Sequence, residues 1–182
     1  VVNLSVPGIH NVYNSLAAIA VARKLGISTD TIIAGLNKFT GTDRRFQKKG
    51  SFNGITVVDD YAHHPDEISA TLESTRHFEH NRVWCVFQPH TYSRLHDLFN
   101  EFSEAFTDSD LTVFADIFSA SRETNIYGIS SKDLSDAVPG SLYLPSFAEI
   151  EDYLRKEITK DDVLIVMGAG DINAVAKNLT KQ

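Results

Sequence analysis

Short apolar segments alternate with longer amphipathic ones over most of this chain, and this alternation constrains its fold more than any other feature. The apolar segments, which predict strands, are residues 55–58, 83–87, 111–115, 141–144 and 163–167. The amphipathic segments, which predict helices, are residues 65–78, 93–106, 131–137, 147–156 and 171–179. Strands that are apolar at every position, such as 83–87, are typical of parallel sheets covered by helices on both faces. We therefore expect a doubly wound, mostly parallel α/β sheet over residues 51–182.

Two helices and a polar segment precede this region. Apolar residues at helical spacing predict helices over 11–25 and 30–39, and a glycine follows each of them. The next segment is polar and positively charged, a composition typical of a linker or hinge. The expected parts are two helices within residues 1–42, a hinge at residues 43–50 and the α/β domain at residues 51–182.

The charge balance and the single cysteine exclude several functional classes. With 17 Lys and Arg against 24 Asp and Glu, the net charge of -7 argues against a broad cationic surface for nucleic acid. Cys85 has no second cysteine to pair with, which fits a reducing, cytoplasmic location. No apolar run approaches the ~20 residues that a membrane span needs. Because the chain begins at Val1 and its one methionine is Met167, we expect a piece of a longer protein.

Polar clusters follow the first three predicted strands. They are residues 59–65 (DDYAHHP), 88–94 (QPHTYSR) and 116–123 (DIFSASRE). The carboxyl ends of parallel strands meet at one edge of a sheet, which is where α/β proteins bind ligands. The clusters would bring three histidines, two arginines and several carboxylates to that edge, where a substrate could bind.

Each of these residues also has a structural interpretation. His64 precedes a proline and could simply begin the next helix, and His90 and Arg94 could form surface hydrogen bonds. The histidines and Asp60 could instead form a zinc or iron site. However, no His-Glu-x-x-His run gives a fixed ligand spacing, which argues against a metallohydrolase.

Two further features carry little functional signal. Residues 168–170 (GAG) follow the last strand, but Asn173 holds the third glycine position of the dinucleotide fingerprint, so we expect a tight turn. Cys85 lies within an apolar strand and is expected to be buried and inert. No segment matches the phosphate-binding loop that ends in Gly-Lys-Ser/Thr, so a triphosphate site would lie outside these residues.

Five motifs in order along the chain resemble the Mur ligases of bacterial peptidoglycan synthesis. They are residues 7–14 (PGIHNVYN), 41–46 (GTDRRF), 59–65 (DDYAHHP), 87–94 (FQPHTYSR) and 168–172 (GAGDI). The resemblance spans nearly the whole chain and implies the carboxy-terminal portion of a three-domain ligase. Residues 1–42 would be the helical tail of the central ATPase domain, and residues 51–182 the Rossmann-like domain that brings the amino acid. The UDP-sugar domain, the phosphate loop and the magnesium ligands would lie outside, so the chain alone is expected to be inactive.

The resemblance also implies the reaction and its substrates. ATP, with Mg²⁺, would phosphorylate the carboxylate of UDP-N-acetylmuramate, and the amine of L-alanine would attack the acyl phosphate to form an amide. The residues that match nucleotide-binding positions are His10, Asn11, Asn14, Arg45 and Asp60. The residues that match the L-alanine pocket are Tyr61, His63, His64, His90 and Arg94. A histidine could take the proton of the amine, and His63, His64 and His90 stay open as candidates.

One position departs from the family pattern, and two other functions stay open. Some members carry Arg where this chain has Thr91, so carboxylate binding here would depend on Arg94 and the histidines.

A related recycling ligase attaches a tripeptide to the same sugar nucleotide, but residues 88–90 favour the addition of L-alanine. A stand-alone α/β binding module would lack a phosphate loop upstream of Val1, whereas a ligase must have one.

Overall fold

The computed structural model describes residues 1–6, 8–77, 79–119 and 121–181. Within these residues the central feature is a six-stranded sheet with the strand order β1-β2-β6-β3-β4-β5. The strands are β1 (Gln47–Phe52), β2 (Ile55–Asp60), β3 (Val83–Phe87), β4 (Leu111–Phe114), β5 (Leu142–Tyr143) and β6 (Val163–Met167). β1 pairs antiparallel with β2, and the other neighbours pair in parallel. The prediction of a mostly parallel α/β sheet is confirmed.

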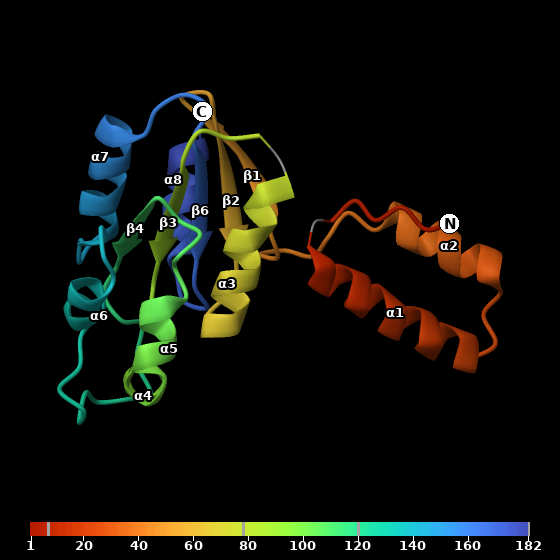
Figure 1. Ribbon diagram of the computed structural model, residues 1–182, viewed down its shortest axis with the longest axis horizontal. Coiled ribbons are helices and arrows are strands. Elements are labelled where there is room, and N and C mark those ends of the chain that lie inside the picture. Colours follow the sequence, from red (N-terminus) through yellow and green to blue (C-terminus); the bar gives the residue numbers. More distant parts are fainter. Residues whose placement is uncertain (7, 78, 120, 182) are drawn as a thin grey trace.

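Helices cover both faces of this sheet (Figure 1). One face is covered by α3 (Pro65–Glu73), α4 (Tyr92–Asp97), α5 (Phe99–Glu104) and α6 (Ser131–Ala137), and the 3-10 helix η1 (Ser74–His77) follows α3. The opposite face is covered by α7 (Phe147–Glu157) and α8 (Asn173–Thr180). A separate cluster of buried apolar side chains fills the space under each helical layer, so the sheet is doubly wound as predicted.

The alternation of side chains along β3 shows how the sequence builds both cores. Cys85 and Phe87 pack into the cluster under α3 to α6, whereas Trp84 and Val86 pack into the cluster under α7 and α8. Successive side chains of a strand point to opposite faces, so a strand with a helical layer on each side is apolar at every position. Burying each large apolar side chain contributes about 1.5–3 kcal/mol, and this burial fixes the strand at the centre of the sheet.

The amino-terminal edge of the sheet differs from the prediction. The sequence predicts a hinge over 43–50, whereas residues 47–50 form the first part of β1. Asn53 and Gly54 join β1 to β2 with φ angles of 49° and 84°, the left-handed conformation that the tight turn of a hairpin requires. β1 is an edge strand with the polar sequence QKKGSF, and it therefore lacks the apolar run by which the other strands were predicted. The division into domains at this segment stays a prediction.

Two predicted helices are interrupted in the structure. The helix predicted over 93–106 is divided into α4 and α5, because Leu98 (φ -118°, ψ 28°) departs from helical geometry. The helix predicted over 65–78 becomes η1 after Glu73, and Phe78 lies outside the described residues. α4 and α5 still contribute Leu95 and Phe102 to the buried cluster on this face, so the helical layer is still formed.

The two amino-terminal helices, α1 (Ile9–Lys24) and α2 (Thr29–Lys38), lie beside the sheet (Figure 1). Within the described part of the chain neither helix has a buried residue, and Tyr13, Val21 and Leu25 are 66%, 61% and 73% exposed. Gly8, just before α1, approaches η1 so closely that a Cβ there would lie 2.8 Å from Ser74 Oγ. The start of α1 is therefore the end that contacts the α/β domain. No helix of the described residues is long and apolar enough to cross a membrane.

Candidate active site

The carboxyl ends of the parallel strands meet at one edge of the sheet, as predicted. The backbone N–H of Gln88, after β3, donates to the carbonyl oxygen of Met167 at 3.0 Å. The N–H of Gly168, after β6, donates to the carbonyl oxygen of Asp60 at 3.2 Å. A parallel bridge between His90 and Phe118 adds the segment that follows β4. The three polar clusters of the sequence therefore lie on one rim.

The glycine-rich turn after β6 is filled by protein atoms. Gln88 Oε1 accepts a hydrogen bond from the N–H of Ile172 at 3.2 Å. A Cβ on Gly170 would lie 2.4 Å from the same oxygen and 2.6 Å from Phe118 Cγ, so close packing requires glycine there. Residues 168–170 thus form the tight turn that the sequence predicts, and Gln88 and Phe118 occupy the space beside it.

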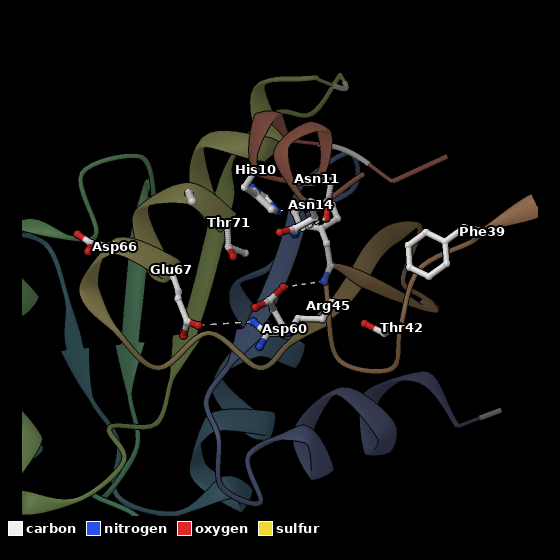
Figure 2. A pocket seen from close by; sticks show the side chains of 12 residues that line it. His10, Asn11, Asn14, Phe39, Thr42, Arg45, Asp60, Asp66, Glu67 and Thr71 are labelled. Carbon is white, nitrogen blue, oxygen red and sulfur yellow. Dashed lines mark hydrogen bonds and ion pairs between the residues drawn. The ribbon is translucent and has the colours of Figure 1, made fainter. Parts of the chain in front are cut away.

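A cavity of about 560 Å³ lies between the start of α1 and the edge of the sheet (Figure 2). It is lined by all the residues that match nucleotide-binding positions, namely His10, Asn11, Asn14, Arg45 and Asp60. The first three come from α1, whereas the other two come from the segment before β1 and from the end of β2. We name this space the first cavity. Its volume is typical of small-ligand sites, and its amide, guanidinium and carboxylate groups suit a polar ligand.

Asp60 is buried (4% exposed) and holds together the backbone that borders the first cavity. Its Oδ1 accepts from the N–H of Ala62 at 2.7 Å, and its Oδ2 accepts from the N–H of Phe46 at 2.6 Å. Burial raises the pKa of this carboxyl, and the two backbone hydrogen bonds oppose the rise. The resemblance places Asp60 among the nucleotide-binding positions, and the structure adds that it positions two backbone segments. Each carboxylate oxygen keeps a further lone pair that could accept from a ligand.

The ring of Tyr61 lies next to two guanidinium groups. The Cζ atoms of Arg44 and Arg45 lie 4.9 and 5.7 Å from the centroid of the ring, within the range of cation–π attraction. The backbone N–H of Tyr61 also donates to the carbonyl oxygen of Arg44 at 2.7 Å. The ring meets the ring of His63 edge-on, with 5.3 Å between centroids. Tyr61 therefore connects the first cavity with the histidines of the rim.

A second cavity, of about 620 Å³, opens between the β3–α4 connection and the segment after β4. Its lining residues are His90, Thr91, Ser93, Arg94, Asp97, Leu98, Arg122 and Glu123. Thr91 has a φ of 72°, a conformation that β-branched residues rarely adopt and that tends to occur at functional sites. Because Arg94 and Arg122 supply positive charge and Glu123 supplies a carboxylate, this second cavity suits a small ligand that carries both charges.

Two lining residues of the second cavity have shifted pKa values. Burial lowers the pKa of His90, and Arg94, whose Nη1 lies 3.3 Å from His90 Nδ1, lowers it further. The Oγ and N–H of Ser93 donate to the carboxylate of Glu123 at 2.6 and 3.1 Å, and these bonds lower the pKa of Glu123. Near neutral pH, His90 is therefore neutral and Glu123 is ionised.

The structure separates the histidines predicted for the amino-acid pocket. His90 and Arg94 line the second cavity, and the ring of His63 lies 6.0 Å from the ring of His90. His64 begins α3, where its Nδ1 lies 3.7 Å from Asp66 Oδ2 and its side chain is 45% exposed. His64 is not among the described residues that line either cavity. His64 therefore precedes the first residue of α3, which is the structural interpretation that the sequence offered for it.

The residues do not form a metal site within the described part of the chain. No group of three or more His, Cys, Asp or Glu side chains is placed there to hold a metal ion. Asp60, the carboxylate considered as a ligand for zinc or iron, instead accepts hydrogen bonds from two backbone N–H groups.

The lining residues include several that were not predicted as site residues, among them Glu67, Arg122 and Glu123. Glu67 lines the first cavity, and its carboxylate lies 3.7 Å from Arg45 and 3.2 Å from His63 Nδ1. Arg122 and Glu123 line the second cavity. Signals for them exist in the sequence, since Glu67 follows His63 by four residues, a spacing typical of ion pairs, and the other two end the third polar cluster.

A mostly parallel sheet with helices on both faces, and two cavities lined in part by charged side chains at the carboxyl ends of its strands, define a ligand-binding α/β domain. Residues 44–170 of this domain match the family described as "Mur ligase, glutamate ligase domain". The chain belongs to the Mur ligase family.

Curated relatives match almost the whole chain. The UDP-N-acetylmuramate--L-alanine ligase of Lachnospira eligens is 56% identical over 184 residues, which are 99% of this chain and 40% of that protein. The enzyme of the same name from Clostridium acetobutylicum is 49% identical over 175 residues, which are 94% of this chain and 38% of that protein. The chain thus spans about two fifths of the length of the curated relatives it matches.

Solved structures of two ligases show the same fold over the same span. The UDP-N-acetylmuramate-alanine ligase MurC from Thermotoga maritima has a TM-score of 0.79 and 27% identity, covering 98% of this chain and 38% of that one. The murein peptide ligase from Psychrobacter arcticus has a TM-score of 0.70 and also 27% identity, with 98% and 38% coverage. Because both matches cover nearly the whole chain, the likeness includes α1 and α2 together with the sheet.

Proposed function

We propose that this chain is the carboxy-terminal portion of a UDP-N-acetylmuramate--L-alanine ligase, an ATP-dependent enzyme that forms an amide bond in peptidoglycan synthesis. The observation that carries this proposal is the identity of 56% and 49% to curated enzymes of that name over almost the whole chain. The gathering of the predicted nucleotide residues around one cavity supports it independently of the names.

The first cavity is the proposed site of the nucleotide, and its residues fit that ligand. The amides of Asn11 and Asn14 would present donors and acceptors to the edge of adenine. His10 lies 3.2 Å from Asn11 Nδ2 through its Nε2 and would orient that amide. Arg45 would oppose the charge of the phosphates, and Asp60 would accept from ribose hydroxyls.

The second cavity is the proposed site of L-alanine. Arg94 is the natural partner of the amino-acid carboxylate, and Arg122 adds a second positive charge to the same cavity. Tyr61 and His63 would close this pocket on the side that faces the nucleotide. His64 stays a proposed member only through its place next to His63.

The parts that this chain lacks are also proposed. The exposed apolar side chains of α1, such as Tyr13 and Val21, would pack against a central ATPase domain. We place the phosphate loop and the ligands of Mg²⁺ in that domain, with the UDP-sugar domain beyond it; when bound, the metal would neutralise phosphate charge. A cytoplasmic location is part of the proposal and agrees with the lone Cys85. The chain alone is expected to be inactive.

The proposed chemistry requires the nucleotide and the amino acid to bind at the same edge of the sheet. A carboxylate is a poor acyl donor, so ATP would first phosphorylate the lactyl carboxylate of UDP-N-acetylmuramate, and the amine of L-alanine would then attack the acyl phosphate. Water must be excluded while that intermediate exists. Closure of the α/β domain would exclude water and bring the amine to the acyl carbon.

The test is phosphate release by the full-length protein that contains this chain, supplied with ATP, Mg²⁺ and UDP-N-acetylmuramate. Release that depends on L-alanine is the expected result. Release only with a tripeptide would favour the recycling ligase. That ligase is a second candidate because the murein peptide ligase structure and the MurC structure have the same sequence identity to this chain, 27%. Release with neither would contradict both and favour a binding module.

A further inference from the structure

His63 lies between the two cavities, and one of its ring nitrogens faces acceptors. Its Nδ1 is 2.9 Å from the carbonyl oxygen of Tyr61 and 3.2 Å from Oε2 of Glu67. A carbonyl oxygen and an ionised carboxylate can only accept hydrogen bonds, so Nδ1 carries a proton. In the neutral ring, Nε2 therefore carries the lone pair.

Glu67 is held in place by contacts with His63 and Arg45. Its Oε2 accepts from the backbone N–H of His63 at 3.0 Å, and its Oε1 lies 3.7 Å from Arg45 Nη1 (Figure 2). Burial alone would raise the pKa of Glu67, but the His63 N–H, the His63 ring and Arg45 together lower it, so the carboxyl is ionised at neutral pH. A fixed carboxylate beside an imidazole orients the ring.

His90 has the opposite arrangement. Its Nδ1 faces Arg94 Nη1 at 3.3 Å, and because a guanidinium can only donate, this nitrogen is the acceptor. The neutral ring then carries its proton on Nε2, which leaves His90 able to donate to a ligand but with no free lone pair. His63 and His90, which the sequence left open as candidates to take the amine proton, are therefore distinguished by their hydrogen bonds.

On this geometry, and resting on the function proposed above, we propose that His63 accepts the proton of the amino-acid amine through Nε2 and that Glu67 is its positioning residue. The amino acid enters as an ammonium ion and transfers one proton to Nε2, which frees the lone pair of nitrogen. That lone pair forms the C–N bond to the acyl carbon. The C–O bond to phosphate then breaks, and phosphate leaves with the electron pair. One further proton leaves the nitrogen for the released phosphate, and His63 returns its own proton to water.

The test compares two nucleophiles in the full-length enzyme. L-Alanine must lose a proton before it attacks, whereas hydroxylamine is already unprotonated at neutral pH and captures the acyl phosphate as a hydroxamate without a base. We expect His63→Gln to lower kcat for amide formation by about 100-fold or more and to leave hydroxamate formation unchanged. Glu67→Gln should lower amide formation in the same direction but less.

The controls separate a catalytic role from a structural one. His96 lines neither cavity, although its partner Asp97, at 2.9 Å, lines the second one, and His96→Gln, which leaves Asp97 in place, should change neither product. Equal loss of both products in His63→Gln and in Glu67→Gln would overturn the proposal, as would unchanged amide formation in His63→Gln. Amide formation by the wild type is the baseline, so failure of the proposed function appears there and failure of this inference appears only in the variants.

Discussion

The guanidinium of Arg44 donates a hydrogen bond to the carbonyl oxygen of Gly168, 124 residues further along the chain. Its second terminal nitrogen donates to the carbonyl oxygen of Gly170 at 3.2 Å, and its Nε lies 3.5 Å from Asp59 Oδ1. Asp59 is fully buried, burial raises the pKa of its carboxyl, and its Oδ2 has no hydrogen-bond partner among the described residues. Arg44 thus joins the segment before β1 to the turn after β6 and compensates a buried carboxylate.

Replacing this arginine should destabilise the chain. Arg44→Met removes the guanidinium that donates to two carbonyl oxygens, and it leaves the Asp59 carboxylate without the Arg44 cation. We therefore expect the free energy of unfolding to fall by about 3 kcal/mol. Urea unfolding of the 182-residue chain measures it. Adding Asp59→Asn to Arg44→Met should recover part of the loss, because the buried charge is then gone. Fully additive losses would contradict the coupling of the two side chains.

Asp162 should make stability depend on pH below about 4. It accepts hydrogen bonds from Arg82, Trp84 and Thr159, and although burial alone would raise its pKa, these bonds lower it from 3.8 to about 2. Because its pKa is lower in the folded state than in the unfolded state, ionised Asp162 stabilises the folded protein at pH values above about 4, by roughly 2 kcal/mol. That contribution is lost as the pH falls from about 4 towards 2.

The matching variants are Asp162→Asn and Asp161→Asn, measured by denaturant unfolding at pH 7 and at pH 3. Asp162→Asn should cost roughly 2 kcal/mol at pH 7 and less at pH 3. Asp161 has a φ of 70°, a conformation that Asn tolerates, so its variant should keep the stability of the wild type. An equal cost of Asp162→Asn at both pH values would show that its charge is not the cause.

Gly170 should tolerate no side chain. A Cβ there would meet Gln88 Oε1 at 2.4 Å and Phe118 Cγ at 2.6 Å, so Gly170→Ala should cost about 1–3 kcal/mol by overpacking. Gly35 is the control, since a Cβ there meets nothing within 4 Å inside α2. Gly35→Ala should stabilise the chain by about 0.5–1 kcal/mol. Thermal unfolding of both variants compares them, and a harmless Gly170→Ala would contradict the packing described for this turn.

Cys85 should not react in the folded protein. The side chain is fully buried in β3, and burial raises the pKa of its thiol. Because the thiolate is the reactive form, a thiol reagent should label the chain only after unfolding. Labelling followed at increasing urea concentrations should coincide with the unfolding transition, whereas rapid labelling in buffer would mean that β3 is open to solvent.

The fold was predicted best where the pattern of burial is extreme. β3 and β6 have the predicted bounds, since a strand with a helical layer on each face is apolar at every position. β1 was not predicted because it is a polar edge strand whose pairing depends on β2. The break at Leu98 was also missed, because the apolar spacing continues through it from α4 into α5.

The candidate site was predicted as residue types but not as contacts. The motifs supplied Arg45 and Asp60, and the structure places both at the first cavity. That Asp60 accepts the N–H of Phe46, or that Glu67 lies between Arg45 and His63, depends on segments brought together by folding. The binding roles themselves stay predictions.

The most direct test of the two-cavity account is a steady-state comparison of Arg45→Ala and Arg94→Ala in the full-length enzyme, measuring KM for ATP and for L-alanine in each. Loss of a charge-assisted contact predicts that Arg45→Ala raises KM for ATP by about tenfold or more, and that Arg94→Ala does the same for L-alanine. Each variant should leave the other KM close to that of the wild type. Both variants raising the same KM, or neither raising either, would contradict the assignment of one cavity to the nucleotide and the other to the amino acid.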